Sequence, residues 1–204
     1  MVENASSAAR AGRRINLENV TILVMDGSPH GLEILCQVLS GFGCKQILRA
    51  GKIEEAQKFV EKTPVDLIVA DPDVPGEDGY DFLRNLRRSK REPNCYVPIV
   101  LVTGHTSMSN VKRSRDIGAN VIVAKPISSK IIFERIAWVS SDPRPFVETK
   151  MYVGPDRRFK FAGPPSGTDG RREQDLPPDI GESDGPNMSQ SEVDSLIKPQ
   201  KVSL

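Results

Sequence analysis

Four polar side chains in this sequence each directly follow a short apolar run: Asp26, Asp71, Thr103 and Lys125. A carboxylate can attack phosphorus as a nucleophile and form an acyl phosphate. A lysine ammonium can pair with one phosphoryl oxygen, and a threonine hydroxyl can hydrogen-bond another. A few carboxylates together with waters can hold Mg²⁺, which offsets phosphate charge. The four residue types therefore suit phosphoryl transfer to a carboxylate, with Asp71 as the nucleophile.

These side chains can meet only if the apolar runs are neighbouring parallel strands. Four of the runs are short, β-rich and nearly continuous, which is typical of parallel strands covered on both faces, and a weaker fifth run fits a strand nearer the edge. Right-handed crossovers place the carboxyl ends of such strands on one edge of the sheet. The expected strands are residues 20–25, 46–50, 66–70, 98–102 and 120–124.

Helical patterns separate the apolar runs. Strand and helix alternate five times between residues 20 and 140. This alternation predicts an α/β fold with helices on both faces of the sheet. The expected helices are residues 29–41, 52–62, 79–90, 107–117 and 128–140.

Bulk properties exclude several classes of protein. A formal net charge of +1 over 204 residues argues against a globally electrostatic nucleic-acid binder, so we expect no nucleic-acid partner. Cys36, Cys44 and Cys95 share no metal-ligand spacing and are expected to be reduced thiols. We find neither the apolar core of a signal peptide nor a run long enough to span a membrane, and therefore expect a cytoplasmic protein without a membrane partner.

Residues 20–140 resemble the receiver domain of two-component response regulators. The resemblance is carried by "ILVMD", "DLIVADPDVPGEDGYDFLRNLR", "PIVLVTG" and "GANVIVAKPI". It implies a five-stranded parallel, doubly wound, flavodoxin-like sheet in the order 2-1-3-4-5. We assign residues 19–141 to this domain.

The resemblance also implies roles for the polar residues. Asp71 would be the phosphoacceptor, phosphorylated by a histidine kinase or a phosphotransfer protein. Asp26, Asp71 and the backbone carbonyl of Asp73 would hold Mg²⁺, while Thr103 and Lys125 would contact the phosphoryl group. Such a domain catalyses only its own phosphorylation and dephosphorylation, so we do not expect an enzyme.

Two positions depart from the family pattern. Gly27 stands where a second acid normally binds Mg²⁺, so weak metal binding is expected. The side chain of Asp73 either compensates or faces outward. Ile122 replaces an aromatic residue that changes rotamer on activation in many members. The alternative function is therefore a degenerate, phosphorylation-independent receiver that serves as a docking scaffold or binds a second messenger such as cyclic di-GMP.

The remaining sequence suggests output by binding. Residues 1–18 are predicted to be a flexible lead-in. Residues 142–186, rich in proline and glycine, are predicted to be a mostly disordered linker. A short amphipathic helical peptide is expected at 187–199, before the terminus at 200–204. We find no DNA-binding pattern and no catalytic cluster after residue 141, which favours a stand-alone response regulator that signals through protein contacts.

The terminal peptide has its own signals. Ser189 and Glu192 form a capping box, and Val193, Leu196 and Ile197 share one helical face. With Asp194, these residues resemble the N-terminal segment of the flagellar motor switch protein, which docks on chemotaxis receivers. The peptide is expected to bind either the output face of its own receiver or another receiver, which would link the protein to chemotaxis or motility.

Two basic groups are further candidates for partner binding. Lys112, Arg113 and Arg115 form a basic strip on the fourth helix, where the plain alternative is a solvated face. Arg157 and Arg158 lie among aromatic residues, a composition that suits a phosphate-bearing ligand such as a cyclic dinucleotide. The plain alternative is a short turn that packs against the domain.

Overall fold

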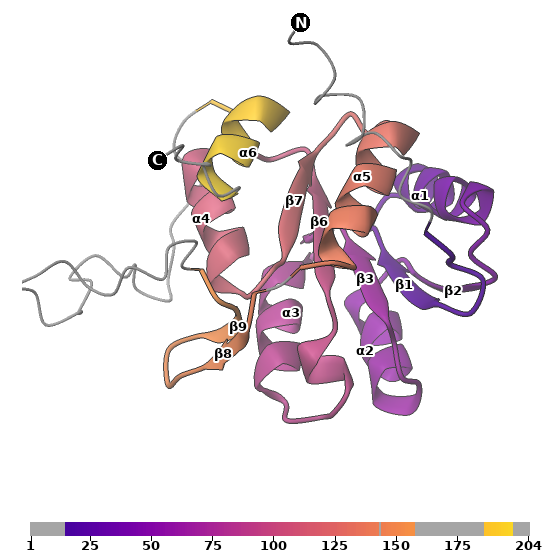
Figure 1. Cartoon of the computed structure of the whole chain (residues 1–204), viewed down its shortest axis with the longest axis horizontal. Helices are drawn as coiled ribbons and strands as arrows, with labels where there is room; N and C mark the ends of the chain where they lie inside the picture. Colours follow the sequence, from indigo (N-terminus) through magenta and orange to yellow (C-terminus); the bar gives the residue numbers. More distant parts are fainter. Residues whose placement is uncertain (1–14, 143, 158–185, 198–204) are drawn as a thin grey trace, which may run out of the picture.

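The computed structural model describes residues 15–142, 144–157 and 186–197. A five-stranded parallel sheet in the order β2-β1-β3-β6-β7 forms its centre (Figure 1). The α/β class, the five main strands and the predicted order are therefore confirmed. The strands of this sheet are β1 (Thr21–Met25), β2 (Gln46–Ala50), β3 (Leu67–Ala70), β6 (Ile99–Thr103) and β7 (Val121–Ala124).

Five helices connect and cover the strands at the places expected from the sequence. Three of them begin at a serine whose side-chain oxygen accepts a hydrogen bond from the first turn, namely Ser28, Ser107 and Ser128. The helices are α1 (Pro29–Gly41), α2 (Ile53–Lys62), α3 (Gly79–Arg88), α4 (Met108–Asp116) and α5 (Ser129–Val139). The shorter elements are β4 (Asp73–Val74), β5 (Glu77–Asp78), η2 (Asn94–Tyr96), β8 (Phe146–Glu148), β9 (Val153–Pro155) and α6 (Gln190–Ile197).

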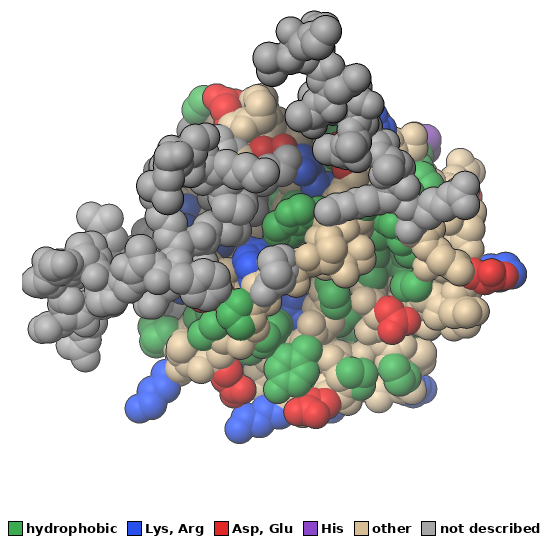
Figure 2. All heavy atoms as spheres, in the orientation of Figure 1, with side chains coloured by type: hydrophobic (Ala, Val, Ile, Leu, Met, Phe, Trp, Pro, Cys, Tyr) green, Lys and Arg blue, Asp and Glu red, His purple; other side chains and the backbone are tan. Residues whose placement is uncertain are grey.

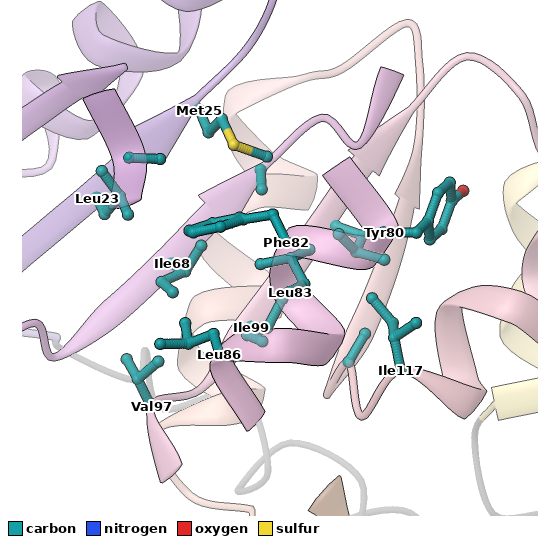
Figure 3. Packing of buried hydrophobic residues seen from close by; sticks show 14 of the residues in the cluster. Leu23, Met25, Ile68, Tyr80, Phe82, Leu83, Leu86, Val97, Ile99 and Ile117 are labelled. Carbon is teal, nitrogen blue, oxygen red and sulfur yellow. The ribbon is translucent and has the colours of Figure 1, made fainter. Parts of the chain in front are cut away.

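Alternate strand side chains enter two separate cores. One core packs α2, α3 and α4 against one face of the sheet, and Figure 3 shows Phe82, Leu83 and Leu86 of α3 among the strand residues Leu23 and Ile68. The other core packs α1 and α5 against the opposite face. Burial on both faces explains why the strands have continuous apolar sequences rather than alternating ones.

The predicted flexible lead-in is corrected at its end. Leu17 is buried and Ile15 packs beside it in the core under α1 and α5. Burial of apolar area holds these residues on the domain. Residues 1–14 lie outside the described part of the chain.

The predicted disordered linker is wrong for residues 144–157. Here β8 and β9 form an antiparallel hairpin against α3. Tyr152 is 6% exposed, and its hydroxyl donates to the carbonyl of Pro155 at 2.6 Å. The buried Arg87 guanidinium lies 5.2 Å from the ring centre of Phe146. Aromatic burial outweighs the local proline and glycine content, while residues 158–185 lie outside the described part.

Charged side chains do not gather on the face that Figure 2 displays. Acidic and basic groups are interspersed there with apolar ones among the described residues. None of the described helices has the length and apolar character needed to cross a bilayer.

The hairpin gives a stability prediction. Tyr152→Ala should lower the free energy of unfolding by about 3 kcal/mol, because it removes a buried aromatic ring. Met151→Ala, at a 70% exposed position of the same hairpin, should change it by less than about 0.5 kcal/mol. Urea denaturation of both variants measures the difference. Equal stability of the two variants would show that the hairpin is not part of the folded domain.

Candidate functional site

Three of the predicted site residues meet at the carboxyl edge of the sheet. The ammonium of Lys125, which follows β7, lies 2.9 Å from Oδ2 of Asp26 and 2.5 Å from Oδ2 of Asp71. Asp26 is 1% exposed and Asp71 is 5% exposed. One lysine therefore bridges two buried carboxylates that come from different strands.

Backbone hydrogen bonds fix both carboxylates. Oδ1 of Asp26 accepts from the amide of Ser28 at 2.8 Å, and Oδ1 of Asp71 accepts from the amide of Asp73 at 2.9 Å. The amide of Asp71 itself donates to the carbonyl of Met25, at the end of β1. The peptide bond that follows Lys125 is cis. Each carboxylate thus directs its second oxygen to the lysine.

Burial and pairing set the protonation of the site. Burial raises the pKa of the Asp71 carboxyl above its usual range, and the hydrogen bond from Lys125 only partly opposes this shift. Burial lowers the pKa of the Lys125 ammonium, but its bonds to Asp71 and Asp26 outweigh that effect and leave it raised. Lys125 is therefore a firmly charged cation beside the predicted nucleophile.

Thr103 is at the same edge but has a different partner. Its hydroxyl donates to Oδ2 of Asp73 at 2.9 Å. The same oxygen lies 2.8 Å from Nδ1 of His105, and the amide of His105 donates to the Thr103 hydroxyl at 3.0 Å. The Asp73 side chain therefore does not simply face outward, and it holds the hydroxyl predicted to contact a phosphoryl group.

The sequence analysis missed His105. Its signal was the spacing, because His105 follows Thr103 by two residues as Asp73 follows Asp71. The two loops lie at the same edge of the sheet. Polar residues two positions after Asp71 and after Thr103 can therefore face each other.

Gly27 is enclosed by the loop after β3. A Cβ at this position would lie 2.4 Å from Cδ of Pro75 and 3.1 Å from Cα of Val74. Such distances are far shorter than van der Waals contact, so an acid cannot replace Gly27 unless the loop shifts. The loop after β3 thus packs so closely against Gly27 that it leaves no room for the side chain of a second acid.

The carboxylates at this edge form a small donor set for a metal ion. The described residues contain no group of three or more His, Cys, Asp or Glu side chains that could hold a metal. Mg²⁺ is commonly bound by only one or two carboxylates, with waters and phosphate oxygens completing its octahedron. Asp26 and Asp71, with the backbone carbonyl of Asp73, match that smaller set.

The proposed basic strip is not a uniform surface. Arg113 turns to α3, where it pairs with Asp78 and lies 4.3 Å from the ring centre of Tyr80. Arg115 pairs with Asp116, so Lys112 is the exposed member of the strip.

One of the two arginines predicted to bind a phosphate-bearing ligand is instead paired within the protein. Arg157 pairs with Asp116 and lies 4.1 Å from the ring centre of Tyr152, as the plain turn-packing alternative expected. Arg158 lies outside the described residues. Ile122 is buried in the core under α4.

The terminal peptide is present as α6, which packs beside β7 (Figure 1). Its capping box is formed: the amide of Ser189 donates to Glu192 at 2.7 Å, and the amide of Glu192 donates back at 3.4 Å. Val193 is fully buried. Side chains of Leu196 and Ile197 lie outside the described part.

Asp194 pairs with Arg135, a second site residue that was not predicted from the sequence. Its Oδ2 lies 2.5 Å from the guanidinium of Arg135 on α5, and both side chains are largely buried. The available signal was a charged residue on the apolar face of a helix, because Arg135 lies between Ile132 and Ile136.

Comparison with known proteins places the domain in a family. Residues 22–137 match the response regulator receiver domain. The probable chemotaxis protein CheY of Rhizobium etli is 28% identical over 111 residues, which cover 54% of this chain and 84% of that protein. A probable cyclic di-GMP phosphodiesterase of Vibrio cholerae is 25% identical over 59% of this chain, which spans only 26% of the relative.

Solved structures show the same fold. The response regulator TrrA of Thermotoga maritima, in complex with Mg²⁺ and BeF, matches with a TM-score of 0.51 and 26% identity. The match covers 59% of this chain and 98% of that one.

The site gives a pKa prediction. The Asp71 carboxyl should titrate above the usual aspartate value of about 3.9, and Lys125→Met should raise its pKa further by removing the neighbouring cation. Lys130→Met, which removes an exposed lysine on α5, should leave it unchanged. Carbon-13 NMR of the carboxyl measures all three. An unshifted Asp71 in the Lys125 variant would contradict the bridging arrangement.

The same shift fixes a pH dependence of stability. A carboxyl whose pKa is higher in the folded state binds more protons there than in the unfolded state. Its contribution is therefore present below the unfolded-state pKa and is lost as pH rises through the folded-state pKa. Asp71→Asn should remove this loss from the urea-unfolding profile at pH values above the unfolded-state pKa, whereas an unchanged profile would contradict the assigned shift.

Proposed function

We propose, because this chain belongs to the response regulator receiver domain family, that it accepts a phosphoryl group on Asp71 and signals in the cytoplasm through protein contacts. The family acts in two-component signalling, and its receiver domains interact with histidine kinases and phosphotransfer proteins. The observation that carries the proposal is the Lys125 ammonium held between the buried carboxylates of Asp26 and Asp71.

The proposed reaction uses the free carboxylate of Asp71. One of its oxygens forms a bond to phosphorus while the bond from phosphorus to the donor's imidazole nitrogen breaks, and that bond's electron pair stays on the imidazole. Lys125 offsets the negative charge gathered at the site. Without this cation, that charge would oppose in-line attack on the phosphoryl group. Thr103 contributes its hydroxyl to a phosphoryl oxygen after it leaves Asp73.

Receiver domains generally bind Mg²⁺, and here Asp26, Asp71 and the backbone carbonyl of Asp73 would hold it. When bound, the ion supplies positive charge beside the phosphoryl oxygens. We propose that binding is weak because Gly27 contributes no ligand and Lys125 already pairs with both carboxylates.

The chemotaxis relative favours an output in chemotaxis or motility, exerted by a bound protein rather than by DNA. The face formed by α4, β7 and α5 is the proposed contact surface, because a helical peptide already lies there. We propose that the domain catalyses only its own phosphorylation and dephosphorylation.

One observation favours a second candidate, the phosphorylation-independent scaffold. With Lys125 bridging the carboxylates, the site is charge-paired without any metal or phosphoryl group. Binding of cyclic di-GMP through Arg157 has less support, because this side chain pairs with Asp116 and stacks on Tyr152.

Labelling with acetyl phosphate tests the first proposal. The protein should gain one Mg²⁺-dependent, acid-stable and base-labile phosphoryl group, and Asp71→Asn should abolish it. Asp81→Asn, at an exposed position of α3, is the matched control and should label normally. Absence of labelling at saturating Mg²⁺ would contradict the proposed phosphorylation and would favour the phosphorylation-independent scaffold.

The enclosed glycine gives a separate prediction. Gly27→Asp alone should lower the free energy of unfolding by about 1–3 kcal/mol, because its Cβ would overlap Pro75. Gly27→Asp with Pro75→Ala should recover part of that loss and bind Mg²⁺ about tenfold more tightly than the unchanged protein. Urea denaturation and a fluorescence or calorimetric Mg²⁺ titration measure both effects. Unchanged Mg²⁺ affinity in the double variant would contradict the explanation for weak binding.

A further inference from the structure

The C-terminal segment contacts the loop between β6 and α4 through hydrogen bonds to backbone and side-chain groups. Thr106 and Met188 exchange two of them: the amide of Met188 donates to the carbonyl of Thr106 at 2.9 Å, and the Thr106 hydroxyl donates to the carbonyl of Met188 at 2.5 Å. Asn187 adds two more, because its amide oxygen accepts from the amide of Thr106 at 3.1 Å and its nitrogen donates to the carbonyl of Gly104 at 2.9 Å.

Gln190 binds the outer edge of β7. Its side-chain oxygen accepts from the amide of Ala124 at 2.6 Å, and its nitrogen donates to the carbonyl of Ile122 at 3.2 Å. Since β7 is an edge strand, these backbone groups have no neighbouring strand to pair with. The glutamine amide thus supplies the donor and acceptor that a sixth strand would supply.

Two further contacts anchor the helix. Val193 is fully buried in the core under α4, and Asp194 pairs with the largely buried Arg135 of α5. An ion pair that is buried on both sides is costly to break from one side, because it leaves an uncompensated charge. The segment therefore occupies a specific site rather than lying loosely on the surface.

The clamped loop directly follows Thr103, whose hydroxyl is predicted to contact the phosphoryl group. Thr103 ends β6 immediately before Gly104, and His105 lies between the two clamped residues. In this arrangement the Thr103 hydroxyl is bonded to Asp73, and the His105 amide is bonded to that hydroxyl. Movement of Thr103 to a phosphoryl group on Asp71 would break this set and shift the loop that Asn187 and Met188 hold.

We propose that residues 187–194 are an internal ligand of the α4–β7–α5 face, and that their docking opposes phosphorylation of Asp71 through the Gly104–Thr106 loop. This rests on the proposed function of Asp71. Coupling between two sites is reciprocal. Docking makes the phosphorylated arrangement of Asp71 and Thr103 less favourable, and phosphorylation therefore weakens docking by the same factor. Tethering through residues 158–185 gives the segment a high effective concentration.

The occupant is this chain's own segment, acting in cis. A partner that binds the same face must displace it, so phosphorylation would expose that face to proteins that carry a comparable asparagine–glutamine–valine–aspartate pattern. A site closed by an internal ligand also requires no separate output domain.

Rates of acetyl phosphate labelling in the full chain test the coupling. Asn187→Ala with Gln190→Ala should label about fivefold faster or more, because the clamp is weakened. Gln57→Ala, at an exposed position of α2, should label at the unchanged rate. A synthetic peptide of residues 186–198 should slow the double variant, and the same peptide with both alanines should not. Equal or slower labelling of the double variant would overturn the proposal.

Amide chemical shifts separate this proposal from the function of Asp71. In an Asp71→Asn background, the double variant should move the amide signals of Thr106 and Ala124. If these signals stay in place, docking is wrong even where Asp71 is labelled. If they move but no form of the protein is labelled, the phosphoacceptor function and the proposed opposition fail together. A dimeric mass by sedimentation, lost in the double variant, would overturn docking in cis in favour of a second copy.

Discussion

The arrangement of the carboxyl edge depends on one lysine between two buried carboxylates. Charges as buried as those of Asp26 and Asp71 are stable only when they are paired and hydrogen-bonded. Lys125 supplies the cation, and amides of the neighbouring loops supply the remaining hydrogen bonds. Its position depends in turn on β7, which the sheet places beside β6. Parallel strands of the correct order are therefore what brings charges from three distant parts of the sequence together.

The second constraint is the open edge of β7. An edge strand exposes unpaired backbone groups, and proteins commonly cover such edges. Here the cover is a helix whose glutamine side chain binds two of these groups. The same segment binds the loop after β6, so the cover of the sheet and the position of Thr103 are linked through a single loop. The proposed phosphoacceptor and the proposed contact face are thereby connected without an aromatic side chain at position 122.

Much of this arrangement follows from the sequence, for identifiable reasons. Continuous apolar runs that each end on a polar residue predicted the strands, and the edge at which Asp26, Asp71 and Lys125 meet. The hairpin at 146–155 was not predicted, because proline and glycine are abundant around it and the burial of Tyr152 depends on distant residues of α3 and its loop. The partner of Thr103 was also not predictable, since the side chains of Asp73 and His105 come together only after their two loops are placed. Arg135 was visible as a charge on an apolar face, but its partner lies in a different part of the chain.

The central claim is that phosphorylation of Asp71 and docking of the C-terminal segment oppose each other. Hydrogen exchange of the Ala124 amide tests it most directly, because this amide donates to Gln190 only while the segment is docked. The account predicts slow exchange in the unphosphorylated full chain, and clearly faster exchange in a sample that mass spectrometry shows to be phosphorylated on Asp71. Equal or slower exchange in the phosphorylated sample would contradict the account.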